Sequence, residues 1–108
     1  MFEINGYEWY LKFVEPYSIE LQRDDGSYTV GMCNNTTKTI YIDSSLRGRF
    51  LKKVLCHEIA HAAMFSYGVD LTIEQEEIIV DIIATYGEEI LKITNKLFKK
   101  LKYERLLL

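Results

Sequence analysis

The hexapeptide CHEIAH, Cys56 to His61, holds both histidines of the 108-residue chain, and they lie four residues apart. Apolar residues recur at helical spacing on both sides of this stretch, which predicts an α-helix. Residues four apart return to the same face of a helix. His57 and His61 are therefore expected to point to one side, while Glu58 is rotated by about 100° from His57.

This H-E-x-x-H pattern predicts a zinc site. Two imidazoles on one helix face can bind one ion, as in the tetrahedral zinc sites of enzymes. Zinc lowers the pKa of a bound water to about 7, and Glu58, beside the ligands rather than among them, can then serve as general base. The chemistry that follows is hydrolysis of an amide bond. The simpler interpretation is a pair of ordinary histidines on a half-buried helix.

A catalytic zinc needs a third protein ligand and one open position. The segment IEQEEIIVD (73–81) offers four acidic candidates, Glu74, Glu76, Glu77 and Asp81. Only Glu77 has a second acid, Asp81, four residues further along the same helix face. We therefore predict Glu77 as the ligand and Asp81 as the acceptor of the far N–H of a ligating histidine. Glu76 is expected to point elsewhere, and Glu74 to complement the helix dipole.

The rest of the chain predicts a single α+β domain over residues 1–108. YEWYLKFV (7–14) and TIYID (39–43) have the composition of strands, and Asp25-Gly26 and the polar residues 34–38 are typical of turns. Alternation within TIYID places Ile40 and Ile42 on one face, which favours a small antiparallel sheet with one buried face.

Two or three helices are expected to pack on this sheet. Ser44 or Ser45 can cap the helix that carries CHEIAH, and Gly68 can end it. A capping box at Thr72 begins a second helix that is apolar nearly all round and is therefore expected to be central and buried. Gly87 is expected to kink this helix or to separate it from a last, lysine-rich one.

Three stretches together, TIYIDSSL, LCHEIAHAAM and EEIIVDIIATYGEEI, resemble the ImmA/IrrE-like metallopeptidases of phages and mobile elements, a minimal gluzincin type. The matching features are Asp43 at the end of a strand, the H-E-x-x-H helix, Glu77 at the start of a helix, and Ala84 seven positions later. The family usually has alanine and asparagine where this chain has Val80 and Asp81.

The resemblance implies a zincin-like fold and a zinc peptidase that cuts a regulatory protein such as a helix-turn-helix repressor. It also implies a β-hairpin before the active-site helix whose edge strand can hold an extended substrate. The alternative is a binding module, such as an antirepressor, that keeps the zinc but does not cut. The intact Glu58 favours the enzyme over this alternative.

Composition excludes other classes of function. The net charge of −3 argues against direct nucleic-acid binding. No apolar run approaches the roughly 20 residues of a membrane span, and the first residues lack the pattern of a signal peptide. Two cysteines, Cys33 and Cys56, are too few for a disulfide scaffold and are expected to be reduced. These features predict a cytoplasmic protein.

Overall fold

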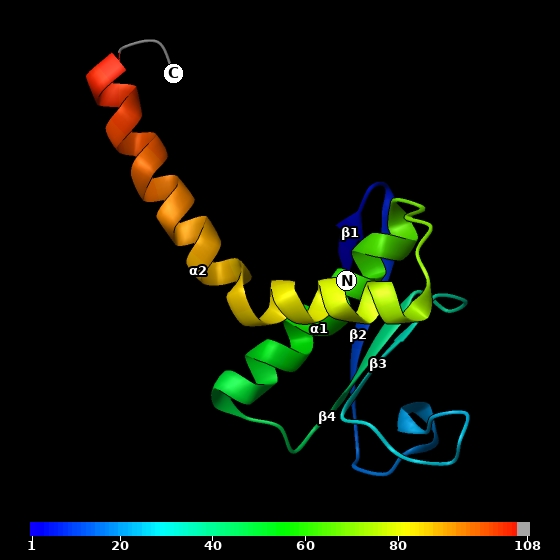
Figure 1. Cartoon of the computed structure of the whole chain (residues 1–108). Helices are drawn as coiled ribbons and strands as arrows, with labels where there is room; N and C mark the ends of the chain where they lie inside the picture. Colours follow the sequence, from blue (N-terminus) through cyan, green and yellow to red (C-terminus); the bar gives the residue numbers. More distant parts are fainter. Residues whose placement is uncertain (106–108) are drawn as a thin grey trace.

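The computed structural model describes residues 1–105, and Figure 1 shows how their helices and strands are arranged. Four strands come first, β1 (Phe2–Ile4), β2 (Tyr7–Val14), β3 (Gly31–Asn34) and β4 (Thr39–Asp43), with the short 3-10 helix η1 (Ile19–Leu21) between β2 and β3. Two α-helices follow, α1 (Gly48–Ser66) and α2 (Ile73–Arg105). The predicted α+β class is confirmed.

The four strands form one sheet in the order β1-β2-β4-β3. The β1–β2 and β3–β4 pairs are antiparallel, but β2 and β4 are parallel, with Leu11 opposite Ile40 and Phe13 opposite Ile42. The expectation of an all-antiparallel sheet is therefore wrong for one pair. The reason is the long connection 15–38, which crosses over and contains β3, so that β4 returns beside β2 in the same direction.

Strand β1 was not expected from the strand pattern, because it has only three residues. It forms a hairpin with β2 around Asn5 and Gly6, whose φ angles of 48° and 81° are both left-handed. Such a two-residue turn matches the twist of a hairpin. The side chain of Asn5 donates a 3.0 Å hydrogen bond to the carbonyl of Ser66, which fixes the hairpin to the end of α1.

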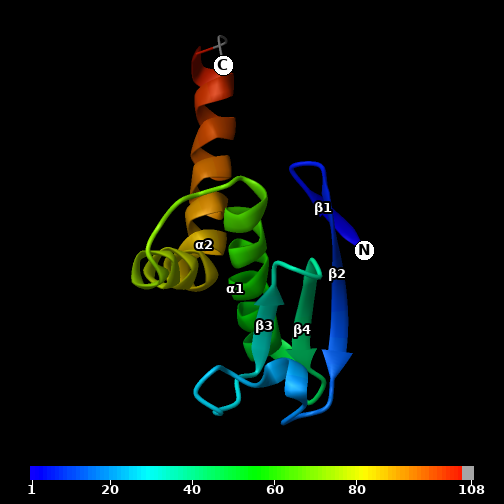
Figure 2. The same ribbon diagram turned by 90° about the vertical axis from the view of Figure 1, so that its right-hand side faces the viewer.

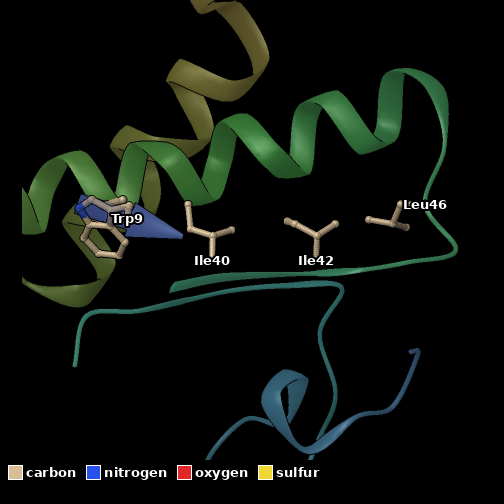
Figure 3. Close-up of a cluster of buried hydrophobic side chains, with 5 residues drawn as sticks. Trp9, Ile40, Ile42 and Leu46 are labelled. Atoms are coloured by element: carbon tan, nitrogen blue, oxygen red, sulfur yellow. The ribbon is translucent and has the colours of Figure 1, made fainter. Parts of the chain in front are cut away.

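Helix α1 lies between the sheet and α2, as Figure 2 shows. The side chains buried between α1 and the sheet are Trp9, Ile40, Ile42, Leu46 and Ala62, and four of them are labelled in Figure 3. The indole of Trp9 donates a 2.8 Å hydrogen bond to the hydroxyl of Ser66, so its one polar group is satisfied. This core fixes the face that α1 turns to the sheet, and with it the direction of the H-E-x-x-H residues.

Helix α1 begins at Gly48, later than the predicted caps at Ser44 or Ser45. The carboxylate of Asp43 accepts hydrogen bonds from the backbone N–H and the hydroxyl of Ser45, at 2.7 and 2.6 Å. This local turn occupies the serine that could otherwise cap the helix. Asp43, singled out by the resemblance, thus shapes the connection between β4 and α1.

The turn between the helices follows the prediction. Gly68 has a φ of 62°, the left-handed conformation that favours glycine after a helix end. The capping box is also confirmed, because the backbone N–H of Thr72 donates to Gln75 Oε1 at 3.1 Å and that of Gln75 donates to Thr72 Oγ1 at 3.2 Å.

Helix α2 is one continuous helix of 33 residues rather than two, and it bends midway along its length in Figure 1. The expectation that its first half is buried all round is wrong. Val80 is fully buried against α1, but Ile78 and Ile82 are 61% and 48% exposed. Helix α1 covers one side of α2, and no other described element covers the opposite side. Among residues 1–105, no helix is long and apolar enough to cross a membrane.

Candidate metal centre

The H-E-x-x-H residues lie where α1 meets the first half of α2. The spacing of four residues places both histidine side chains on this side of α1. The side chains of His57 and His61 are 22% and 11% exposed, so both are largely withdrawn from solvent. Their imidazoles face one another, with 4.9 Å between ring centroids.

Glu77 of α2 completes the group. Its Oε1 lies 3.0 Å from Nε2 of His61, and its Oε2 lies 3.3 Å from Nε2 of His57. One potential ligand atom from each of the three residues lies within 4.8 Å of the other two. The structure therefore brings together the three residues that the sequence predicts as ligands. Two imidazole nitrogens and one carboxylate are a donor set that catalytic zinc sites use with a fourth position open.

Two further carboxylates contact the Nδ1 atoms of the two imidazoles. Asp81 Oδ1 lies 3.0 Å from Nδ1 of His57, and Glu76 Oε2 lies 2.6 Å from Nδ1 of His61. Because an ionised carboxylate only accepts hydrogen bonds, each Nδ1 carries the proton. In a neutral imidazole this leaves a lone pair on Nε2, the state in which histidine binds a metal.

The inner nitrogens of the two imidazoles converge with the Glu77 carboxylate. Nε2 of His57 and Nε2 of His61 lie 3.2 Å apart, and the Glu77 carboxylate faces both. A proton on either Nε2 makes these contacts hydrogen bonds or ion pairs. With the protons at Nδ1 instead, three electron-rich groups face one point, where a divalent cation could take the place of that proton. The donor set thus fits a zinc ion held by His57, His61 and Glu77.

Glu58 lies beside this group and is buried, with 7% of its surface exposed. It packs against β3 at Gly31, where an added Cβ would lie 3.1 Å from Glu58 Cγ and Oε2. Burial raises the pKa of the Glu58 carboxyl, while the charges of His57 and His61 oppose the rise. A carboxylate in such a position binds a proton more readily than an exposed one.

A cleft of about 840 Å³ opens over these residues. All four residues of β3 line it, together with His57, Glu58 and His61. Strand β3 is at the edge of the sheet, so one side of its backbone has no neighbouring strand among the described residues. Arg23 also lines the cleft, and its positive charge favours the ionised form of Glu58. Arg23 is a cleft residue that sequence reasoning missed, because it lies in an irregular loop far from the helix.

The two cysteines lie in different places, and both are free thiols. Cys33 lines the cleft, and burial raises its pKa to about 12, with the charges of Glu58 and Glu76 acting in the same direction. Its thiol is therefore protonated at neutral pH in this environment. Cys56 lines a separate groove between α1 and α2, away from the histidine pair.

The expectation for Glu76 is wrong. Glu76 was expected to point away from the histidines, yet it makes the shortest contact to either of them. Its side chain is 17% exposed, whereas that of Asp81 is 63% exposed. Helix α2 crosses the histidine pair so that adjacent residues, Glu76 and Glu77, both reach His61. A spacing rule for one helix cannot show how a second helix crosses it.

Comparisons with protein-family models, curated proteins and solved structures give no match to this chain. Its function is therefore inferred from the residues of the cleft.

Proposed function

We propose that this protein is a zinc-dependent peptidase in which His57, His61 and Glu77 hold the ion. The observation that carries the proposal is the convergence of two Nε2 atoms and one carboxylate, with a further carboxylate on each Nδ1. A bound zinc ion supplies Lewis-acid chemistry, polarising a carbonyl and lowering the pKa of water.

Each surrounding residue has a role in this proposal. Glu58 accepts the proton of the attacking water and returns it to the leaving amine, and its raised pKa makes it a stronger base than an exposed glutamate. Asp81 and Glu76 hold the two imidazoles in the orientation that directs Nε2 inward. The burial of Glu58 limits its movement and keeps its carboxylate at the cleft.

The proposed substrate is an extended segment of a protein. Strand β3 is an edge strand and all of its residues line the cleft beside Glu58. An extended peptide can pair with such an edge through backbone hydrogen bonds. On the basis of the sequence resemblance, we further propose a regulatory protein, such as a helix-turn-helix repressor, as the natural substrate. The free thiols of Cys33 and Cys56 fit a cytoplasmic location.

The metal is tested first by elemental analysis of protein purified without chelator and then supplied with zinc. We expect about one zinc per chain, because the group offers three protein ligands. His57→Ala and His61→Ala should each lose the ion, whereas Lys99→Ala, on the second half of α2, should retain it. A wild-type protein that binds no divalent metal would exclude the proposed site.

Catalysis is tested with Glu58→Gln, which keeps nearly the same shape but cannot accept the proton. Wild-type and variant protein, at equal zinc occupancy, are incubated with peptides from a digested proteome, and new termini are identified by mass spectrometry. We expect cleavage by the wild-type protein only. Equal cleavage by both would show that Glu58 is not the base. Tight binding of the same peptides by both, without cleavage, would establish the binding module instead.

A further inference from the structure

The second half of α2 carries an apolar face that no described residue covers. In Figure 1 this half extends away from the sheet and α1 after the bend. The large apolar side chains on it are each 42% to 61% exposed: Ile90, Leu91, Ile93, Leu97, Phe98 and Leu101, together called the distal face. A contiguous apolar patch of this kind marks an interaction site rather than ordinary surface.

The spacing within the distal face is that of a helix that pairs with another helix. Ile90, Thr94, Leu97 and Leu101 follow one another at intervals of four, three and four residues. Over this short stretch, these are the a and d positions through which paired helices contact one another. The lysines of the same segment, such as Lys92 and Lys99, fall on the opposite side of the helix. A lipid surface requires only an apolar side and no such repeat.

We propose that the distal face binds the distal face of a second copy of this chain, with the two helices antiparallel. When the segment is reversed against itself, Ile90 lies opposite Leu101 of the second copy, and Thr94 opposite Leu97. In the same register Leu91 lies beside Phe98 of the second copy. Ile90, Leu97 and Leu101 then each meet an apolar residue or the methyl group of Thr94, and Leu91 meets Phe98, so this part of the face is complementary to itself.

Charge favours the antiparallel arrangement over the parallel one. Glu89 and Lys100 lie on the same edge of the distal face, near its two ends. Reversal brings Glu89 of each copy beside Lys100 of the other, whereas in a parallel pair the two positions stay near opposite ends of the helices and do not meet. Glu89 makes no ion pair within residues 1–105, and the only ion-pair partner of Lys100 there is Glu104, at 3.9 Å. Both charges are therefore accessible to a second copy.

The area is also sufficient. Six large side chains, each about half exposed, present on the order of 500 Å² of apolar surface per copy. Two copies would bury about 1,000 Å², the lower bound for a specific protein interface. After the bend, α2 leads away from α1 and the sheet (Figure 1), and only its start, including Leu91, lines a groove with α1, so that a second helix can lie along the rest. The interface lies on residues outside the metal centre, so the inference does not depend on the proposed function.

Sedimentation equilibrium of the zinc-supplied full chain tests the proposal. We expect a mass of twice 12.7 kDa at micromolar concentration. Leu97→Lys should raise the dimer dissociation constant at least about tenfold, because it places a charge in the centre of the seam. Asn95→Lys adds the same charge outside the seam and should leave the dimer intact. Circular dichroism checks that the variants remain helical.

A charge exchange tests the orientation. Glu89→Lys and Lys100→Glu should each weaken the dimer, and the double variant should restore it, because the two positions meet only in antiparallel pairing. If the double variant does not restore the dimer, the antiparallel arrangement is wrong. A monomer at all concentrations, or a dimer indifferent to Leu97→Lys, overturns the proposal. A monomer that binds anionic phosphatidylserine vesicles through the same face would show a lipid surface to be its partner.

Discussion

Glu58 combines two properties that oppose one another. It is buried beside the histidines and against β3, and burial disfavours the ionised form that its proposed role as general base requires. The neighbouring histidines offset part of this cost, and a bound cation would offset more. In the proposed function, such a site would sacrifice stability for reactivity, a trade-off that is common at catalytic groups.

Glu58→Gln should therefore stabilise the metal-free protein at neutral pH. The raised pKa means that the folded state holds this proton more tightly than the unfolded chain, whose carboxyl ionises near 4.5. Below that pH both states are protonated and the variant gains nothing from this group. As the pH rises, the unfolded state ionises first, so the wild-type protein loses stability relative to the variant until the folded-state pKa is passed. Melting temperatures in chelator from about pH 4 to about pH 8 measure this difference. If the variant is no more stable than the wild-type protein at pH 7, burial of the Glu58 carboxylate does not destabilise the folded state.

Glu76 and Asp81 should differ in their effect on zinc binding. Both accept a hydrogen bond from a histidine Nδ1, but Glu76 is 17% exposed and Asp81 is 63% exposed. Solvent weakens the more exposed contact, so Glu76→Gln should lower zinc affinity by about 10–100-fold and Asp81→Asn by less. Competition with a chromophoric chelator gives the affinities. Glu74→Gln, in the first turn of α2 and without a contact to either histidine, is the matched control. If Glu76→Gln behaves like this control, the 2.6 Å contact does not support the site.

At the scale of elements, the position of Glu58 depends on how closely α1 approaches β3. Gly31 makes this approach possible, since an added Cβ would lie 2.7 Å from Val54 Cγ1. Val54 is β-branched and partly buried against the core, so it has little freedom to move aside. The strand and the helix are thus in contact beside Glu58, and both Gly31 and Glu58 line the cleft.

Gly31→Ala should separate β3 from α1 and displace Glu58. Overpacking of this kind costs about 1–3 kcal/mol of unfolding free energy. The matched control is Gly87→Ala in α2, where an added Cβ meets Ile83 at an ordinary 3.6 Å and where alanine favours a helix. Denaturant unfolding should show a loss for the first variant and no loss for the second. Equal stability of the two variants would mean that β3 and α1 can separate freely.

The sequence predicts those elements that are determined by residues close to one another in the chain. The H-E-x-x-H helix, the capping box at Thr72 and the turn at Gly68 depend on neighbouring residues, and each lies where it was expected. The Asn5-Gly6 turn carried an equally local signal for β1, which was overlooked because the strand is so short. The parallel pairing of β2 with β4 and the approach of Glu76 to His61 depend on contacts between distant segments. No periodicity within one segment can reveal them.

At the scale of the whole molecule, the candidate metal centre lies where the two helices meet. His57 and His61 belong to α1, while Glu77 belongs to α2, and the small core lies on the other side of α1 against the sheet. Much of the exposed apolar surface of α2 contributes nothing to the stability of a single copy. Coordination between the helices is therefore expected to supply a large part of the free energy that holds α2 against α1.

Zinc should accordingly raise the melting temperature of the whole protein. A ligand that binds only the folded state at about 100 times its dissociation constant adds about 2.7 kcal/mol. For a chain of 108 residues, each kcal/mol corresponds to about 4–8 °C, so the rise should be on the order of 10 °C or more. Calorimetry with and without chelator measures this rise. The protein concentration is the same in both conditions, so that a difference in dimerisation does not contribute. Glu77→Ala, which removes the one ligand contributed by α2, should melt at nearly the same temperature in both conditions. A wild-type protein whose melting temperature is unchanged by zinc would show that the two helices are held together without the ion.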